Sequence, residues 1–168
     1  MDNTSSTWTL QDINKAHEAW KSDLNLPIMA KPAGLGKEHD WPSNINQLTS
    51  RQLGDLQLKL TGLYTYVLYL LGKEESDLAT FEALYDIKLG LAMHDLVSSY
   101  RDSKAPLKEV QRALAIKQDS TLSNMYRSLL TRKKHVRYLS DQSKIYSEQL
   151  TRLSREQSRR EMEIRNAL

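Results

Sequence analysis

The residues best suited to chemistry form a dense basic cluster late in the chain. Five cations lie within eleven residues, and no acid occurs between Asp119 and Asp141. The cluster comprises Arg127, Arg132, Lys133, Lys134 and Arg137, and Tyr138 follows it directly. Lysine and arginine neutralise phosphates, and an outward tyrosine ring stacks on an unpaired base. The pattern therefore favours binding of single-stranded nucleic acid, although it is equally typical of a solvated helix face.

A second basic segment lies near the C-terminus. Arg155, Arg159 and Arg160 follow Leu153 in a stretch that has helix-forming composition but no apolar seam. Such a segment is typical either of a frayed, solvated tail or of an arm that becomes ordered on nucleic acid or on an acidic protein surface. We assign these three arginines to the predicted nucleic-acid site, and we expect residues 155–168 to become ordered only on binding.

Candidates for catalysis or metal binding are sparse and poorly spaced. Glu82 and Asp86 stand one helical turn apart, as paired carboxylates would, but Lys88 beside them favours a charged outer face. The four histidines show neither an HExxH pattern nor an i, i+4 pair, and there is no cysteine. The GLGK run at residues 34–37 lacks the spacing of a phosphate-binding loop. We therefore predict a protein that is not an enzyme and holds no metal or cofactor.

Helices must position these residues, because apolar spacings of three and four dominate the chain. The first region, residues 1–48, is expected to hold one short helix at about Leu10–Asp23 and a loop rich in Pro and Gly. The segment Thr49–Gln52 has a capping-box pattern that opens a Leu-rich region. We interpret residues 49–103 as a helical hairpin with a turn at Gly72–Ser76, although a kink there fits the sequence as well.

Pro106 marks the first helical turn of the last region, residues 104–168. Neither Gly nor Pro occurs after Asp119, and a heptad pattern begins with Leu122 at position a. Its apolar a and d residues are Leu122, Met125, Leu129, Val136, Leu139, Tyr146, Leu150 and Leu153. A narrow seam of this kind favours a second helix, so we assign these residues to homo-oligomerisation. Part of the seam would also fit against the Leu-rich region.

Composition and charge limit the possible classes of protein. The chain has 168 residues and a net charge of +3, but residues 1–103 carry −5 and residues 104–168 carry +8. This split favours a polyanionic partner or contact between unlike halves. The N-terminal residues do not show the basic and apolar segments of a signal peptide, and the most apolar run, Leu63–Leu71, is too short for a membrane span. We expect a cytoplasmic all-α protein without membrane contact, built as a helical hairpin or bundle with a long C-terminal coiled-coil-like helix.

This layout resembles that of small helical proteins of tailed phages, and more specifically that of recombination mediators of the UvsY type. The resemblance rests on the Leu-rich helices of residues 50–100, the cationic helix around Arg132–Arg137 and the amphipathic helix that ends in Leu153–Glu156. It is a resemblance of pattern and spans about residues 49–160. It implies a homo-oligomer in the host cytoplasm that binds single-stranded DNA and helps to load a RecA-like recombinase while displacing a single-strand-binding protein.

The lead hypothesis is an oligomeric, non-catalytic accessory protein that binds single-stranded nucleic acid through the outer face of residues 127–138. The alternative is a phage structural or adaptor protein whose coiled coil binds only protein. A third interpretation, an enzyme with an unrecognised site, has no motif to support it. Oligonucleotide binding that weakens with salt would separate the first hypothesis from the second.

Overall fold

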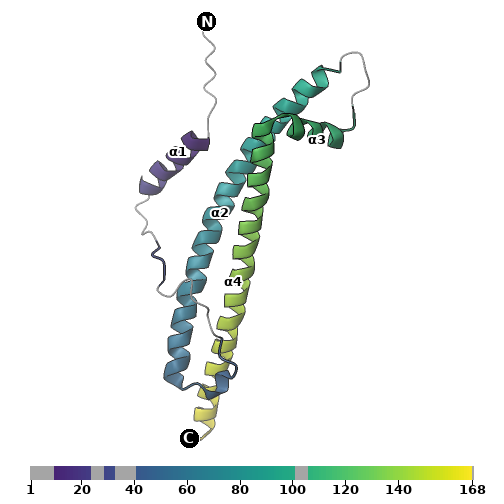
Figure 1. Ribbon diagram of the computed structural model, residues 1–168. Coiled ribbons are helices and arrows are strands. Elements are labelled where there is room, and N and C mark those ends of the chain that lie inside the picture. The colour runs from purple at the N-terminus through teal and green to yellow at the C-terminus, as the bar shows by residue number, and fades with distance from the viewer. Residues whose placement is uncertain (1–9, 24–28, 33–40, 101–105, 168) are drawn as a thin grey trace. The chain divides into compact units, whose positions relative to one another are not determined.

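The structure is a computed structural model that describes residues 10–23, 29–32, 41–100 and 106–167. Its elements are α1 (Leu10–Asp23), the 3-10 turn η1 (Ile45–Gln47), α2 (Ser50–Ser98), α3 (Lys108–Gln118) and α4 (Ser120–Ala167) (Figure 1). The described residues contain no strand, so the predicted all-α fold with a long C-terminal helix is confirmed. None of the helices in these ranges is long and apolar enough to cross a membrane.

Helix α2 is one uninterrupted helix of 49 residues. The hairpin predicted within residues 49–103 is therefore wrong, because no turn forms at Gly72–Ser76. A glycine inside a helix costs only about 1 kcal/mol relative to alanine. The apolar face also continues past it, since Val67, Leu78 and Leu89 follow one another at intervals of 11 residues, which is close to three helical turns. Burial of that face on both sides of Gly72 outweighs the small cost of the glycine.

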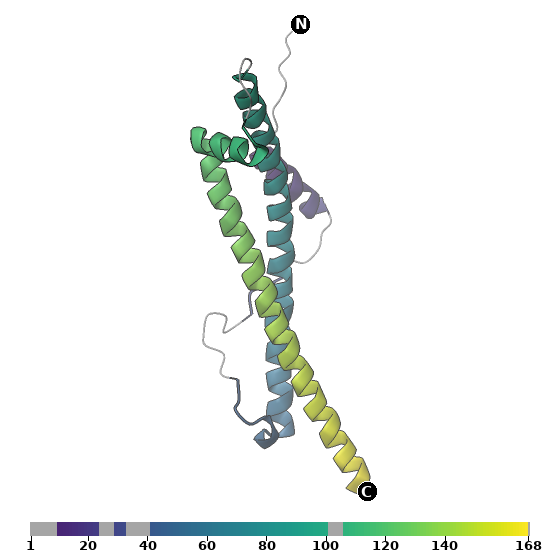
Figure 2. The ribbon, with the colours of Figure 1, turned by 90° about the vertical axis from the view of Figure 1, so that its right-hand side faces the viewer.

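The chain forms two compact units, and each combines segments that are far apart in sequence. Unit 1 comprises Met1–Ile28 and Ser76–Lys133, and unit 2 comprises Met29–Glu75 and Lys134–Leu168. Within each unit, a part of α2 and a part of α4 run side by side in opposite directions (Figures 1 and 2). This division differs from the three successive regions predicted from the sequence, because antiparallel pairing joins residues that are distant along the chain.

The core of unit 1 is built by three helices. It comprises Phe81, Tyr85 and Leu89 of α2, Ala115 of α3, and Leu122 and Leu129 of α4. The start of α4 is set by Asp119, whose Oδ1 accepts hydrogen bonds from the backbone N–H groups of Thr121 at 2.7 Å and Leu122 at 3.1 Å. This N-cap lets α4 begin directly after α3 and directs Leu122 into the core.

Unit 2 has a core of its own, in which α2 packs against α4. Its buried residues are Leu53, Leu60 and Leu63 of α2 and Leu153 of α4. Partly buried residues that pack against them include Trp41, Ile45, Leu48, Tyr146 and Leu150. The predicted capping box forms: the N–H of Thr49 donates to Gln52 Oε1 at 2.8 Å, and the N–H of Gln52 donates to Thr49 Oγ1 at 3.3 Å. It starts α2 so that Leu53 falls in the first turn of the core face.

The heptad seam of α4 faces the chain's own helices. Leu122, Met125 and Leu129 lie in or against the core of unit 1, and Tyr146, Leu150 and Leu153 lie in or against the core of unit 2. Val136 and Leu139 are half-buried. The predicted packing face is therefore present, but six of its eight residues pack within the chain. Their assignment to homo-oligomerisation is corrected, because an antiparallel helix of the same chain satisfies the same apolar spacing.

The C-terminal segment is helical to Ala167, so the expectation that it becomes ordered only on binding is wrong. Glu156 is 8% exposed, and its Oε1 accepts a hydrogen bond from Arg160 Nε at 2.7 Å. The Nη2 of Arg160 also reaches the backbone oxygens of Ile45 at 3.3 Å and Asn46 at 3.4 Å. This contact joins the end of α4 to η1, more than a hundred residues earlier in the chain.

Candidate nucleic-acid interface

Part of the predicted cationic cluster has partners inside the chain. In unit 1, the guanidinium carbon of Arg132 lies 5.2 Å from the centroid of the Phe81 ring. Lys133 Nζ forms an ion pair with Glu82 Oε1 at 2.8 Å. Arg127 is exposed and forms no ion pair with a described residue. We therefore remove Arg132 and Lys133 from the set of residues expected to contact phosphates. The carboxylate of Glu82 is likewise engaged with a cation and is not paired with Asp86.

In unit 2, the exposed face of α4 begins with Lys134, Arg137 and Tyr138. Both cations are exposed, and neither forms an ion pair with a described residue. The Tyr138 side chain is 62% exposed and follows Lys134 by one turn on the same side of the helix. An outward tyrosine beside two cations is the arrangement that the heptad assignment predicts.

The three C-terminal arginines are in different environments. Arg159 forms ion pairs with Glu156 and Glu163 along the helix, and Arg160 is held by Glu156 with its side chain only 18% exposed. Hydrogen bonds from Arg159, and then those from Arg160, lower the pKa of Glu156 to about 2. Arg155 is exposed and forms no ion pair with a described residue. Of the three, Arg155 alone has a cationic group without an acidic partner among the described residues.

Two further exposed cations of α4, Lys144 and Arg152, lie outside the dense cluster in the sequence. Lys144 Nζ lies 3.5 Å from Asp141 Oδ1, and both side chains are more than half exposed, so this ion pair is weak. Arg137, Lys144 and Arg155 share one line on the helix, because separations of 7 and 11 residues are close to two and three turns. The helical spacing of the cations would have predicted this line from the sequence. The density of charge along the sequence identifies only its first member, Arg137.

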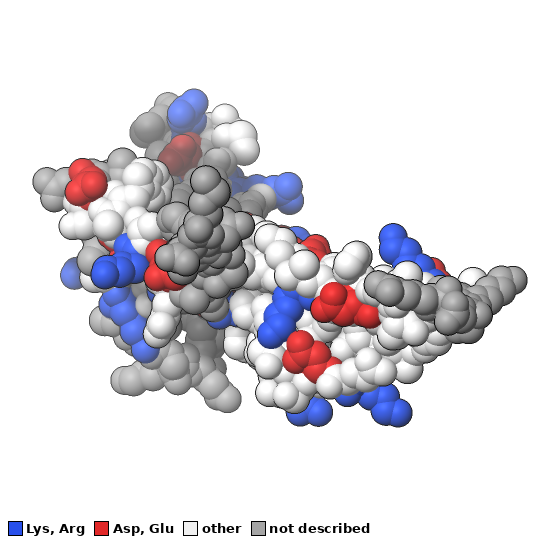
Figure 3. Space-filling model, turned by 90° about the horizontal axis from the view of Figure 1, so that it is seen from above, with Lys and Arg blue, Asp and Glu red and all other residues white. Residues whose placement is uncertain are grey.

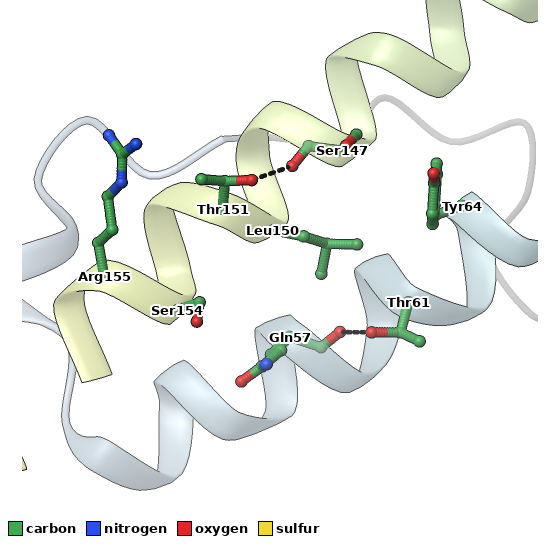
Figure 4. A pocket seen from close by; sticks show the side chains of 8 residues that line it. All are labelled: Gln57, Thr61, Tyr64, Ser147, Leu150, Thr151, Ser154 and Arg155. Atoms are coloured by element: carbon green, nitrogen blue, oxygen red, sulfur yellow. Dashed lines mark hydrogen bonds between the residues drawn. The ribbon is translucent and has the colours of Figure 1, made fainter. Parts of the chain in front are cut away.

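A groove between α2 and α4 of unit 2 lies beside this line (Figure 4). One hollow of about 450 Å³ is lined by Thr61 and Tyr64 of α2 and by Ser147, Ser154 and Arg155 of α4, among others. A second hollow of about 300 Å³ shares Tyr64 and Ser147 and extends to Lys144 and Glu148. Because two residues line both hollows, we treat them as one feature, the α2–α4 groove. Its lining is rich in hydroxyl groups and includes two cations and one acid.

The surface charge is mixed. Figure 3 shows cationic and anionic side chains close together over the visible surface of the described residues. On this face, a polyanion site would therefore be built from particular cations and not from a broad basic surface. Arg137, Lys144 and Arg155 form a regular line of exposed cations in unit 2, and of the three only Lys144 forms an ion pair with a described residue, Asp141.

The remaining candidates for chemistry are isolated. His94 Nδ1 lies 3.4 Å from Asp95 Oδ1, and both side chains are more than four-fifths exposed. Within the described ranges, no group of three or more His, Asp or Glu side chains is placed to hold a metal ion. The glycine run at residues 34–37 and the pair His39 and Asp40 lie outside the described residues.

Comparisons of the chain with protein-family models, with curated proteins and with solved structures found no match. A functional conclusion therefore rests on the geometry of exposed, unpaired side chains. In unit 2 these include Lys134, Arg137, Tyr138 and Arg155, which lie near the α2–α4 groove.

Proposed function

We propose that this protein is a non-catalytic, oligomeric accessory protein that binds single-stranded nucleic acid through the exposed face of α4 in unit 2. One observation carries the proposal: Lys134, Arg137 and Arg155 are exposed, and none of them forms an ion pair with a described residue. Cations without acidic partners displace the counterions of a phosphate backbone, which is a main source of nucleic-acid affinity.

The exposed ring of Tyr138 supports a preference for single strands. A tyrosine that is 62% exposed beside two cations offers its face to a base. Bases of a single strand are free to stack on such a ring, whereas bases of a duplex are already stacked on one another. Phosphate contacts contribute affinity for single strands and duplexes alike. Stacking on the Tyr138 ring adds affinity for single strands only.

The resemblance to UvsY-type mediators supports a role in recombination. In that role the bound strand is passed to a RecA-like recombinase in the host cytoplasm while a single-strand-binding protein is displaced. A homo-oligomer belongs to the same proposal. Its support is an exposed apolar row on α2 of unit 1, where Ile87 and Leu91 are 64% and 63% exposed, because large apolar side chains at the surface favour a covering partner.

The same apolar row favours a second function, that of a protein adaptor. The half-buried Leu84 and the exposed Ile87 and Leu91 follow one another at spacings of three and four residues, as in a helix that lies against another helix. An adaptor would use this row to hold a helix of another protein, and the cations of α4 would only be solvated. Binding of oligonucleotides separates the two functions.

Fluorescence anisotropy with labelled single- and double-stranded oligonucleotides over a salt series tests the proposal. The variant that combines Lys134→Ala with Arg137→Ala should weaken binding to all sequences. It should also reduce the slope of log affinity against log salt by roughly 1 to 2 units, because two phosphate contacts are lost. A matched variant, Lys108→Ala with Arg112→Ala, removes the same charge from exposed positions of α3 and should bind like the parent.

Two results would contradict the proposal in favour of the adaptor. The first is unchanged binding by the Lys134 and Arg137 variant at every salt concentration. The second is an equal loss in the α3 variant, which would mean that net charge, and not the face of α4, determines binding.

A further inference from the structure

The hydroxyl groups of the α2–α4 groove fall into two classes. Thr61 Oγ1 donates to the backbone oxygen of Gln57, and Thr151 Oγ1 donates to the backbone oxygen of Ser147, both at 2.9 Å (Figure 4). These two hydroxyl hydrogens are used within their own helices. The hydroxyl groups of Ser147 and Ser154 form no hydrogen bond with a described residue. They are therefore available as donors to a ligand in the groove.

The groove has an inner and an outer side. In Figure 4, Leu150 points into the space between the two helices, and Tyr64 stands at the facing edge of α2. Arg155 points away from α2, so that its guanidinium lies at the outer edge of α4. The inner side thus offers an aliphatic side chain and a ring, and the outer side offers a cation. A ligand with flat apolar groups on one side and negative charge on the other matches this division.

The two cations of the lining are separated by a distance that suits a polymer. Lys144 and Arg155 are 11 residues apart on one helix, which corresponds to about 16 Å along its axis. Stacked nucleotides rise by about 3.4 Å each, so this distance spans several nucleotides. Glu148, the acid of the lining, disfavours a phosphate between them near Lys144. Contacts to phosphate are therefore expected at the two cations, with sugars and bases between them.

We infer that the α2–α4 groove seats a segment of single strand several nucleotides long, with bases toward Tyr64 and Leu150. Its phosphates would lie along the outer edge, at Lys144 and Arg155. Ser147 and Ser154 donate hydrogen bonds to the backbone of the strand. This inference rests on the proposed function and extends it, because it assigns the path of the strand beyond the Lys134–Tyr138 face.

A helix of another protein fits the groove less well. Helix-binding grooves are lined by apolar pockets that receive side-chain anchors. Here Leu150 is the aliphatic side chain of the larger hollow, and free hydroxyl groups, Gln57 and Arg155 form much of the rest. A docked helix would bury these polar groups without supplying partners for them, at a cost in free energy.

Thiol footprinting tests the path, since the chain has no cysteine. Ser147→Cys and Ser154→Cys are each introduced singly and modified with a maleimide, with and without a single-stranded oligonucleotide of mixed sequence. Ser128→Cys, an exposed position of α4 that lines neither hollow, is the matched control. With oligonucleotide at ten times its Kd, modification of both groove thiols should slow about tenfold, because only unoccupied protein reacts. Modification of the control should be unchanged, and a duplex should protect the groove thiols less.

Each other outcome decides against the path. If anisotropy shows that the oligonucleotide is bound but the groove thiols react as fast as they do without it, the strand does not lie in the groove. That result refutes the path and leaves the proposed function intact. Equal slowing at Ser128→Cys means diffuse coverage and overturns the path too. Slowing that grows with protein concentration in the absence of oligonucleotide assigns the groove to a second copy of the chain. If no oligonucleotide changes the anisotropy, both the proposed function and the path are refuted.

Discussion

Replacing Leu153 with alanine tests which partner the seam of α4 uses. The side chain is 0% exposed and is clustered with Leu53, Leu60 and Leu63 of α2. A buried Leu→Ala change costs about 2.7–5 kcal/mol, because the transfer free energy is lost and a cavity remains. Unit 2 has few other buried side chains that could fill the cavity, so we expect the upper half of that range. Leu130→Ala, on the same helix but 50% exposed, should change the free energy of unfolding by less than about 1 kcal/mol.

Urea unfolding followed by circular dichroism measures this loss and also identifies the partner. If Leu153 packs within its own chain, Leu153→Ala lowers the unfolding midpoint equally at low and high protein concentration, also when the chain associates through Ile87 and Leu91 of α2. If the seam itself forms a dimer, the midpoint of the parent rises with concentration and this dependence is lost in Leu153→Ala. A double-mutant cycle with Leu60→Ala should give a coupling free energy of about 0.5–3 kcal/mol, as expected for residues in contact.

The packing of Leu153 would be refuted by either of two results. One is a destabilisation by Leu153→Ala no larger than that of Leu130→Ala. The other is a concentration-dependent midpoint in the parent that becomes independent of concentration in Leu153→Ala. The second result would return the seam to the homo-oligomer interface that the heptad pattern suggests.

Three further predictions concern single side chains. The pKa of Glu156 is lowered from 4.5 to about 2 by Arg159 and Arg160, so its carboxylate stabilises the fold above about pH 4.5 and this contribution is lost as the pH falls toward 2. In urea titrations between neutral pH and about pH 3, Glu156→Gln should therefore lose less stability than the parent. Tyr138→Ala should weaken single-strand binding by about 1–3 kcal/mol in anisotropy and leave the salt slope nearly unchanged. Asp119→Ala should lower the Tm measured by circular dichroism, because the N-cap of α4 is lost, and Asp119→Asn should recover most of it.

The elements whose sequence signals are local can be predicted without knowledge of the fold. The spacing of Ile13, Ala16 and Trp20 places a helix at Leu10–Asp23, which the structure contains with those bounds. The capping box at Thr49 forms because both of its hydrogen bonds join residues three apart. The outward position of Tyr138 follows from the heptad register, which depends only on the helix period. Each of these features is decided by neighbours along the chain.

The partner that each side chain contacts depends on how the helices pack in the folded chain. Gly72 permits a turn or a helix, and burial of the α2 face on both sides of it selects the helix. The heptad seam predicts that a helix packs on α4, but it does not distinguish a helix of the same chain from a helix of a second copy. The structure provides α2 of the same chain because an intramolecular partner is always present and pays no association entropy.

The candidate site shows the same limit. Lys133 is indistinguishable in sequence from the free cation Lys134. The two differ because α2 brings Glu82 Oε1 to 2.8 Å from Lys133 Nζ. The α2–α4 groove likewise exists only where Tyr64 and Ser147, distant in sequence, line the same space. Charge, periodicity and ion pairs one turn apart are properties of one segment. Ion pairs between helices and the groove need two segments, which are brought together only by folding.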